Sequence, residues 1–383
     1  MTRRRHPQWH LGLSALLLGA AILAALVVNW QSPSAEPVAL LPPLRPPAKT
    51  DTYTLGDSLY AQVETVLEEL GIWPELIVKS QLHQSPVDSI SITVPADLPL
   101  EAVNLALTRF ISWHGGHVMT GVQRSTRRVD IRCGLDSTAT TAFVLRQHPS
   151  LQRKAGRIAI VVDDFGDAAG AHGDLFRAFC QIPQPLTLAV LPNEGDVSAV
   201  LTMAQERDHE IILHLPMEPD DYPHSDPGDG AIFSHQDDDT IRQLVRRALA
   251  RVPDAAGINN HMGSRATADS RVMEAVLSEI KARNLYFLDS RTSGRSVAMI
   301  TAAALELPAA RRDLFIDPVD ERGRVTVSTI EGQLWKLADM ARDTGQAIGI
   351  GHDRRETLRA LESTLPRLES RGHHFVPVSE LVK

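Results

Sequence analysis

Cysteine is nearly missing from this sequence, which has two cysteines among 383 residues, Cys133 and Cys180. They lie far apart and in different predicted domains, so a disulfide framework and a thiolate metal site are both excluded. We expect each to be a small buried hydrophobic side chain. A concentrated basic face is missing as well, because the net charge is −8 and the basic residues are dispersed after the first few positions. This charge pattern argues against a nucleic-acid partner.

Charged residues are also absent from residues 11–28, which closely follow three arginines at positions 3–5. A basic start before an apolar run of this length is typical of a signal peptide or of a membrane anchor. Residues 31–36 offer only a poor A-x-A cleavage pattern, so a retained single-span anchor is favoured over secretion after cleavage. The positive-inside rule keeps the basic tip in the cytoplasm. The chain beyond residues 1–30 then lies across a bacterial inner membrane, in the periplasm.

Residues 31–50 contain six prolines and are expected to form an extended, semi-rigid spacer. The pattern changes after this linker, and residues 51–147 are expected to form a small α+β domain. No catalytic cluster occurs in this domain, and binding of an envelope protein partner is a role that it suits. Its predicted helices are residues 59–70 and 98–113, which have helical spacing, and its predicted strands are residues 89–94 and 127–133, which alternate.

Strands and helices alternate through residues 156–383, as expected of a larger α/β domain. Amphipathic helices are predicted at residues 239–251 and 270–283, and a third, disturbed by Pro366, at residues 358–368. Seven or eight strand–helix units of this length fit a barrel-like or a doubly wound parallel sheet.

Six apolar runs in this domain end in an aspartate or a histidine. Buried parallel strands are continuous apolar stretches, and catalytic groups of α/β folds collect at the carboxyl ends of such strands. We therefore expect these polar residues to form the rim of an active site. They are Asp163 and Asp164, His214, His261, Asp289, Asp317 and His352.

Asp163 and Asp164 are two adjacent carboxylates, which repel each other unless a cation or a proton separates their roles. Neighbouring side chains of an extended chain point to opposite sides, so one carboxylate could bind a metal while the other acts as a base. A solvated turn is the alternative. One carboxylate together with His214 and His261 would make a three-ligand site for zinc or a similar divalent ion, with positions open for water and substrate.

His352 ends an apolar run near the end of the domain, and its imidazole could protonate a leaving amine across the cleft. Asp289 could orient a catalytic histidine or contact substrate. Asp317 precedes Pro318, and a turn residue is the favoured interpretation there. Ser264, Arg265 and Glu218 lie in the same loops and are secondary candidates.

The tract from residue 157 to 381 resembles the divergent polysaccharide deacetylase family, a distant branch of the NodB-like carbohydrate esterases. The resemblance does not cover the anchor, the linker or the small domain. It depends on six blocks in family order, namely VDDFG (162–166), PLTLAVLP (185–192), HLPMEP (214–219), GINNHMGS (257–264), FLDSRTS (287–293) and IGIGH (348–352).

This resemblance implies a distorted (β/α) barrel with a divalent metal in its mouth. It implies that Asp163 is the general base, that Asp164 binds the metal and that His352 is the general acid. The family's metal histidines normally come from one HxxxH motif, but Glu218 stands four residues after His214. His261 is therefore inferred to supply the second imidazole.

The leading hypothesis is a membrane-anchored, metal-dependent hydrolase that deacetylates an N-acetylated envelope polysaccharide, such as peptidoglycan or another amino-sugar polymer. An alternative is a catalytically weak adaptor that binds glycan or an envelope protein. A third possibility is a metal-dependent peptidase or amidase on the same scaffold, because a fold does not determine its substrate.

Overall fold

The computed structural model describes residues 51–382, except for residues 81–86, 167–169, 194, 196, 206, 208 and 321. The predicted anchor at residues 11–28 and the linker at residues 31–50 lie outside this part of the chain. No helix in the described part is long and apolar enough to span a membrane.

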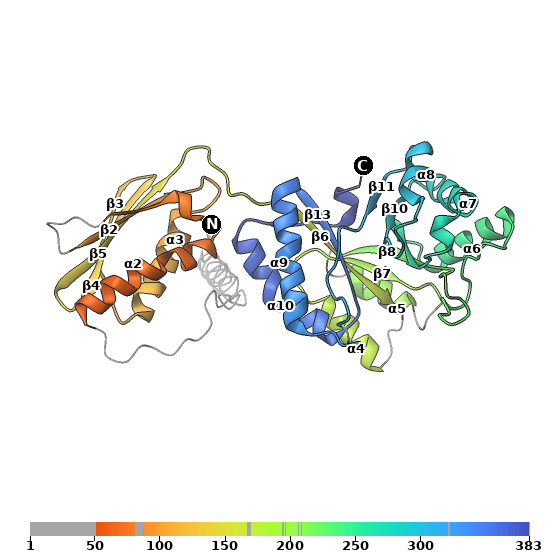
Figure 1. Ribbon diagram of the computed structural model, residues 1–383, viewed down its shortest axis with the longest axis horizontal. Coiled ribbons are helices and arrows are strands. Elements are labelled where there is room, and N and C mark those ends of the chain that lie inside the picture. The colour runs from red at the N-terminus through yellow and green to blue at the C-terminus, as the bar shows by residue number, and fades with distance from the viewer. Residues whose placement is uncertain are drawn as a thin grey trace, which may run out of the picture. The chain divides into compact units, whose positions relative to one another are not determined.

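The small domain contains two helices and one five-stranded sheet (Figure 1). The strand order is β1-β2-β5-β4-β3; β2 and β5 are parallel, and the other pairs are antiparallel. Every second residue of β2 is buried, as expected of a sheet with one face covered. The elements are α2 (Thr52–Glu68), β1 (Ile77–Ser80), β2 (Asp88–Val94), α3 (Leu100–Trp113), β3 (His117–Ser125), β4 (Arg128–Leu135) and β5 (Thr138–Gln147).

Both helices that the sequence predicts in this domain are present, but α2 begins seven residues earlier than predicted. Asp51 explains the difference, because its side chain accepts a hydrogen bond from the Thr54 backbone N–H and caps the helix there. Cys133 and Cys180 are both buried, as predicted.

The larger domain contains a nine-stranded sheet in which every strand pairing is parallel. Its main path runs β11-β10-β9-β8-β7-β6-β13-β12, and β14 pairs with β6. The sheet curls into a half-barrel, and in the described part of the chain its two edge strands, β11 and β12, are not paired with each other. The strands are β6 (Arg157–Phe165), β7 (Thr187–Val190), β8 (Glu210–Met217), β9 (Gly257–Met262), β10 (Tyr286–Asp289), β11 (Ala309–Arg311), β12 (Leu314–Phe315), β13 (Gln346–His352) and β14 (His374–Phe375).

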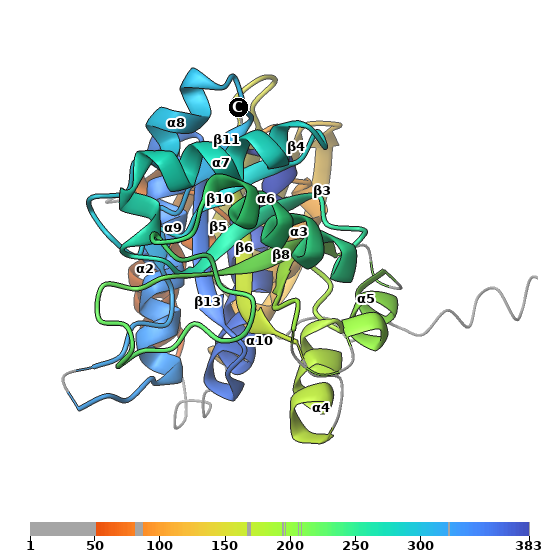
Figure 2. The ribbon, with the colours of Figure 1, turned by 90° about the vertical axis from the view of Figure 1, so that its right-hand side faces the viewer.

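Helices follow most of these strands and cover the outer side of the curled sheet (Figures 1 and 2). The predicted helices at residues 239–251 and 270–283 are α6 and α7, and α10 continues through Pro366. The helices are α4 (Gly170–Phe179), α5 (Val197–Gln205), α6 (Asp238–Arg251), α7 (Ser270–Lys281), α8 (Ala298–Ala304), α9 (Val327–Thr344) and α10 (Arg355–Ser370).

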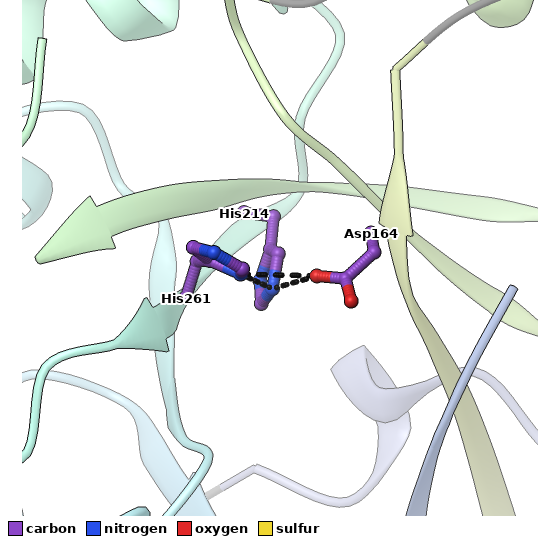
Figure 3. A group of neighbouring side chains, drawn as sticks. All are labelled: Asp164, His214 and His261. Atoms are coloured by element: carbon purple, nitrogen blue, oxygen red, sulfur yellow. Dashed lines mark hydrogen bonds and ion pairs between the residues drawn. The ribbon is translucent and has the colours of Figure 1, made fainter. Parts of the chain in front are cut away.

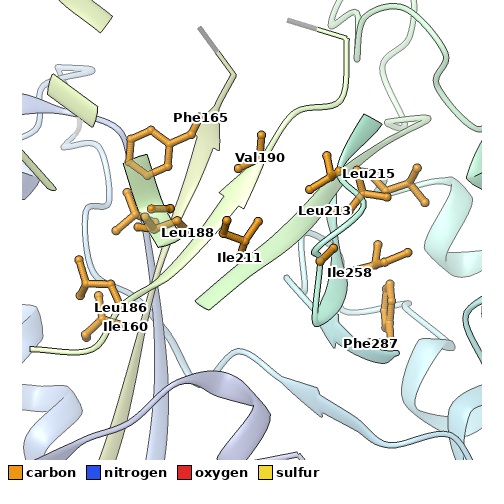
Figure 4. Packing of buried hydrophobic residues seen from close by; sticks show 14 of the residues in the cluster. Ile160, Phe165, Leu186, Leu188, Val190, Ile211, Leu213, Leu215, Ile258 and Phe287 are labelled. Carbon is orange, nitrogen blue, oxygen red and sulfur yellow. The ribbon is translucent and has the colours of Figure 1, made fainter. Parts of the chain in front are cut away.

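Each central strand is buried on both faces, which explains the continuous apolar runs of the sequence. One set of alternate residues, including Ile160, Leu213 and Ile258, packs against the helices in the main core (Figure 4). The other set, including Val161 and Ile350, forms a second cluster on the inner face of the curl.

The period of two along each strand decides which polar residues reach the inside of the half-barrel. Asp163 continues the inner series of β6 after Val161, and His214 continues that of β8 after Ile212. His352 does the same in β13 after Ile350. The carboxyl ends of separate strands therefore present their functional side chains to one common mouth.

Candidate metal centre

Asp164, His214 and His261 form a group in which one ligand atom of each residue lies within 4.8 Å of the others. Asp164 Oδ1 lies 3.2 Å from His214 Nε2 and 3.0 Å from His261 Nδ1. The two imidazole nitrogens are 3.1 Å apart. Figure 3 shows the three side chains pointing toward one another from β6, β8 and β9. These are the three metal ligands that the sequence predicts.

The donor set suits a divalent metal ion. Tetrahedral zinc with bonds of about 2.0–2.2 Å keeps its ligand atoms roughly 3.4 Å apart, close to the spacing of these three atoms. Asp164 Oδ1 is buried and, despite its two imidazole neighbours, makes no hydrogen bond of acceptable geometry. A buried carboxylate oxygen in that position is costly unless a cation or donor satisfies it.

A bulge in β6 brings both adjacent aspartates to the inner face. Val162 and Phe165 both belong to the helix-facing core, and the pairing of β6 with β7 shifts register between them. Two residues therefore lie between outward-facing neighbours, and Asp164 has a left-handed backbone with φ of 75°. The expectation that Asp163 and Asp164 point to opposite sides is wrong, because side chains alternate between the two faces only in a strand without a bulge.

Asn259 belongs to the candidate site by its contacts, although the sequence does not single it out. It is fully buried, its Oδ1 accepts from His214 Nδ1 at 2.7 Å, and its Nδ2 donates to Asp163 Oδ1 at 2.8 Å. A proton on Nδ1 leaves the lone pair of His214 Nε2 free for a metal. The spacing in the sequence could have indicated Asn259. It lies two residues before His261 and therefore faces the same side of β9.

The electrostatics of this cluster favour a bound cation. Burial opposes ionisation of Asp164, but the His214 and His261 imidazoles outweigh burial and hold the pKa of the carboxyl well below its usual range. Burial favours the neutral His214 ring, but Asp163 and Asp164 outweigh it and raise the pKa of His214 to about 9. Without a metal the site therefore holds a proton, which a metal ion would displace on binding.

Asp163 lies beside the ligand group, with its Oδ2 3.8 Å from His214 Nε2. Burial raises the pKa of Asp163, and this effect outweighs the attraction of His214 and His352 for the charged form. A carboxylate whose pKa is raised is a better proton acceptor near neutral pH, which suits the predicted general base. A cavity of about 360 Å³ opens at the ligand group and is lined by Asp164, His261, His172 and Asp353, among others.

His352 is held by Asp317, which corrects the interpretation of Asp317 as a simple turn residue. The buried Asp317 carboxylate accepts from His352 Nδ1 at 2.9 Å and from the His352 backbone N–H at 2.8 Å. Burial favours a neutral His352, but Asp317 outweighs it and raises the pKa of the ring. This arrangement keeps a proton on His352 and suits the predicted general acid.

Asp289 is buried at the end of β10 but has a different set of partners. Its Oδ1 accepts from the Arg291 backbone N–H at 2.8 Å, and its Oδ2 accepts from Ser296 Oγ at 2.8 Å. The carboxylate that is hydrogen-bonded to His352 is therefore that of Asp317, and Asp289 orders the loop after β10.

Glu218, at the place of the second HxxxH histidine, is engaged by neighbouring loops. Its Oε2 accepts from the Ser234 backbone N–H and Oγ, and its Oε1 lies 3.5 Å from Arg265. Ser264 Oγ in turn accepts from the Asp220 backbone N–H. These secondary candidates form a loop-ordering network, and His261 supplies the second imidazole of the ligand group.

Glu218→Gln is expected to leave the metal content of the purified protein unchanged and to lower its thermal stability slightly. The reason is that Glu218 Oε1 and Oε2 serve Ser234 and Arg265 and not the ligand group. Metal analysis by mass spectrometry together with a melting curve would check this. Loss of metal at unchanged stability would make Glu218 a ligand.

A half-barrel with a His/His/Asp group, a buried carboxylate and a carboxylate-paired histidine at its mouth defines an α/β protein with a candidate metal-binding site. Residues 160–382 match the divergent polysaccharide deacetylase family. The chain belongs to this family, as its sequence blocks predict.

Several relatives share this region. The chain is 33% identical over 214 residues to the uncharacterised protein YibQ of Escherichia coli, and the match covers 56% of this chain and 64% of YibQ, less than two thirds of that relative. An uncharacterised Haemophilus influenzae protein is 32% identical over 226 residues, covering 59% and 77% of the two chains. A crystal structure of an uncharacterised Agrobacterium tumefaciens protein has 29% identity and a TM-score of 0.56, covering 60% of this chain and 89% of that one.

Proposed function

We propose that this protein is a metal-dependent hydrolase that removes acetyl groups from an N-acetylated polysaccharide of the bacterial cell envelope. The observation that carries the proposal is the assembly of three ligand atoms, a buried carboxylate and a carboxylate-paired histidine at one mouth. Membership of the deacetylase family supports the same reaction class. Residues 11–28 would anchor the chain in the inner membrane and leave the enzyme in the periplasm, beside peptidoglycan and other amino-sugar polymers.

The reaction requires a cation, a base and an acid with separate roles. A divalent metal held by Asp164, His214 and His261 would supply Lewis acidity to the amide carbonyl and to a neighbouring water molecule. Asn259 donates to Oδ1 of Asp163, which leaves Oδ2 to accept the proton of the attacking water. Attack on the carbonyl carbon is followed by cleavage of the C–N bond.

His352 completes the reaction by protonating the leaving amine. Nδ1 of the His352 ring is hydrogen-bonded to Asp317, so the proton transferred to the amine is the one on Nε2. The products are acetate and a free amino sugar, and every proton is accounted for: the base takes one from water and the acid gives one to nitrogen. Asp163 and His352 act in opposite protonation states because their surroundings differ.

Acetate release from N-acetylated glycans tests this function. The full chain, purified in detergent, would be stripped of metal, reloaded with zinc and incubated with chitin oligosaccharides or peptidoglycan strands. We expect acetate and free amine in equal amounts from the reloaded protein only. Stoichiometric metal without acetate from any glycan would contradict the proposal and favour a binding adaptor or another amide substrate.

Asp317→Asn is expected to move the alkaline limb of the acetate-release profile to lower pH. His352 must be protonated to donate, so activity falls as pH rises through its pKa, and loss of the Asp317 charge lowers that pKa. A pH–rate profile measures the shift. Asp320→Asn, which changes a carboxylate bonded to Arg324 instead, is the matched control. Identical limbs in wild type and Asp317→Asn would remove His352 as the acid.

A further inference from the structure

Arg312 is fixed in place beside the site. It follows β11, and its Nε donates to the Ser290 carbonyl at 2.8 Å while its Nη2 donates to the Arg291 carbonyl at 3.0 Å. Its guanidinium lies 3.4 Å from the centre of the Phe315 ring. A cation held by two backbone carbonyls and one aromatic face is pre-organised, so little side-chain entropy is lost when it binds a ligand.

Two contacts connect Arg312 to the reacting groups. Phe315 also stacks on the imidazole of His352, with ring centres 5.9 Å apart and planes 23° apart. Ser290, whose carbonyl holds Arg312, accepts a hydrogen bond at its Oγ from Asn259, which also holds Asp163. Arg312 is therefore placed within the neighbourhood of both the acid and the base.

Arg312 and Arg291 are close enough to repel each other. Burial lowers the pKa of Arg312, and the charge of Arg291 lowers it further. Arg291 is exposed and has a left-handed backbone with φ of 52°, an unfavourable conformation for this residue type. The Asp289 carboxylate maintains it by accepting from the Arg291 backbone N–H.

Other arginines at this end of the sheet have carboxylate partners. Arg265 pairs with Glu218, and Arg295 pairs with Asp220. In the described residues, no carboxylate oxygen lies within 4.0 Å of the Arg291 or Arg312 guanidinium. The guanidinium groups of Arg291 and half-buried Arg312 thus keep unused N–H donors near the candidate site.

We infer that Arg291 and Arg312 form a subsite for a carboxylate of the polysaccharide. The substrate class is then an acidic polymer in which an N-acetylated amino sugar neighbours a sugar carrying a carboxylate. Guanidinium groups bind carboxylates through paired charge-assisted hydrogen bonds. This inference rests on the proposed function for the identity of the reacting sugar, but the subsite is a binding site and is testable without turnover.

The test compares two tetrasaccharides of equal length by calorimetry on the metal-stripped full chain. Hyaluronan tetrasaccharide carries a carboxylate on every second sugar, and chitotetraose carries none. We expect hyaluronan to bind at least about tenfold more tightly, with a preference that weakens as salt is added. Arg312→Gln and Arg291→Gln should each remove most of the preference and leave chitotetraose binding unchanged.

One control variant and one of the two test variants make the result decisive. Arg247→Gln changes an exposed arginine on α6 and should keep the preference. Within the described residues the Arg291 side chain makes no hydrogen bond, so Arg291→Gln remains informative if Arg312→Gln does not fold. Equal binding of both oligosaccharides, or an unchanged preference in Arg291→Gln, would overturn the inference. A preference that depends on these arginines in a protein that releases no acetate would refute the proposed function and leave the subsite standing.

Discussion

Asp163→Asn is expected to lower acetate release by about 10²–10⁴-fold while the protein keeps its metal, because a positioned general base contributes that much. Asp163 is buried beside the ligand group, with its Oδ2 3.8 Å from His214 Nε2, but it is not one of the three ligands. An amide at this position can still contact Asn259 but cannot accept the proton of water. The measurement is the steady-state rate with zinc-loaded protein, together with its metal content.

The control for this variant is Asp343→Asn, which changes an exposed carboxylate on α9. It should retain wild-type activity. If Asp163→Asn keeps its metal and more than about a tenth of the activity, Asp163 is not the base. If it loses the metal instead, Asp163 belongs among the ligands.

His261→Ala is expected to reduce metal affinity by more than about 10²-fold, since even the loss of an outer partner of a ligand costs roughly 10–100-fold. One of the three ligand atoms disappears, and only Asp164 Oδ1 and His214 Nε2, which lie 3.2 Å apart, remain to hold the ion. The metal content per chain, measured after dialysis against a weak chelator, should fall from one to nearly zero. Acetate release should fall with it.

His224→Ala is the matched control, because His224 is an exposed imidazole in the loop after β8. It should bind one metal per chain. Full metal content in His261→Ala would show that the second imidazole ligand lies elsewhere, and the departure from HxxxH would then need another explanation.

The sequence predicts the ligand residues because their positions follow from strand chemistry. An apolar run that ends in a histidine or an aspartate indicates a buried strand whose end reaches solvent. In β8, β9 and β13 the period of two then carries His214, His261 and His352 to one face. These positions could be predicted without knowing how the strands pair.

Asp317 and Asn259 could not be predicted in the same way. Asp317 precedes Pro318, which is also typical of a turn, and its role depends on strand register. Phe315 pairs with Ile350 in the β12–β13 ladder, so two more residues along each strand bring Asp317 beside His352. Asn259 is a buried amide whose partners come from two other strands, and those contacts depend on sheet order.

The open edge of the sheet and the bulge in β6 are also tertiary features. A barrel and a half-barrel have the same strand–helix alternation, and closure depends on whether β11 and β12 meet. The bulge turns Asp164 toward His214 through a left-handed backbone that aspartate tolerates better than most residues. Nothing in the letters VDDFG distinguishes a bulged strand from a regular one.

Anomalous diffraction at the zinc absorption edge, from crystals of the zinc-loaded full chain, tests the central claim most directly. The account predicts one strong peak bonded to Asp164 Oδ1, His214 Nε2 and His261 Nδ1 at about 2.0–2.2 Å. It also predicts that the side chains of Asp163 and His352 lie beyond bonding distance of the zinc ion. No peak at this position, or a peak bonded to Glu218 in place of His261, would contradict it.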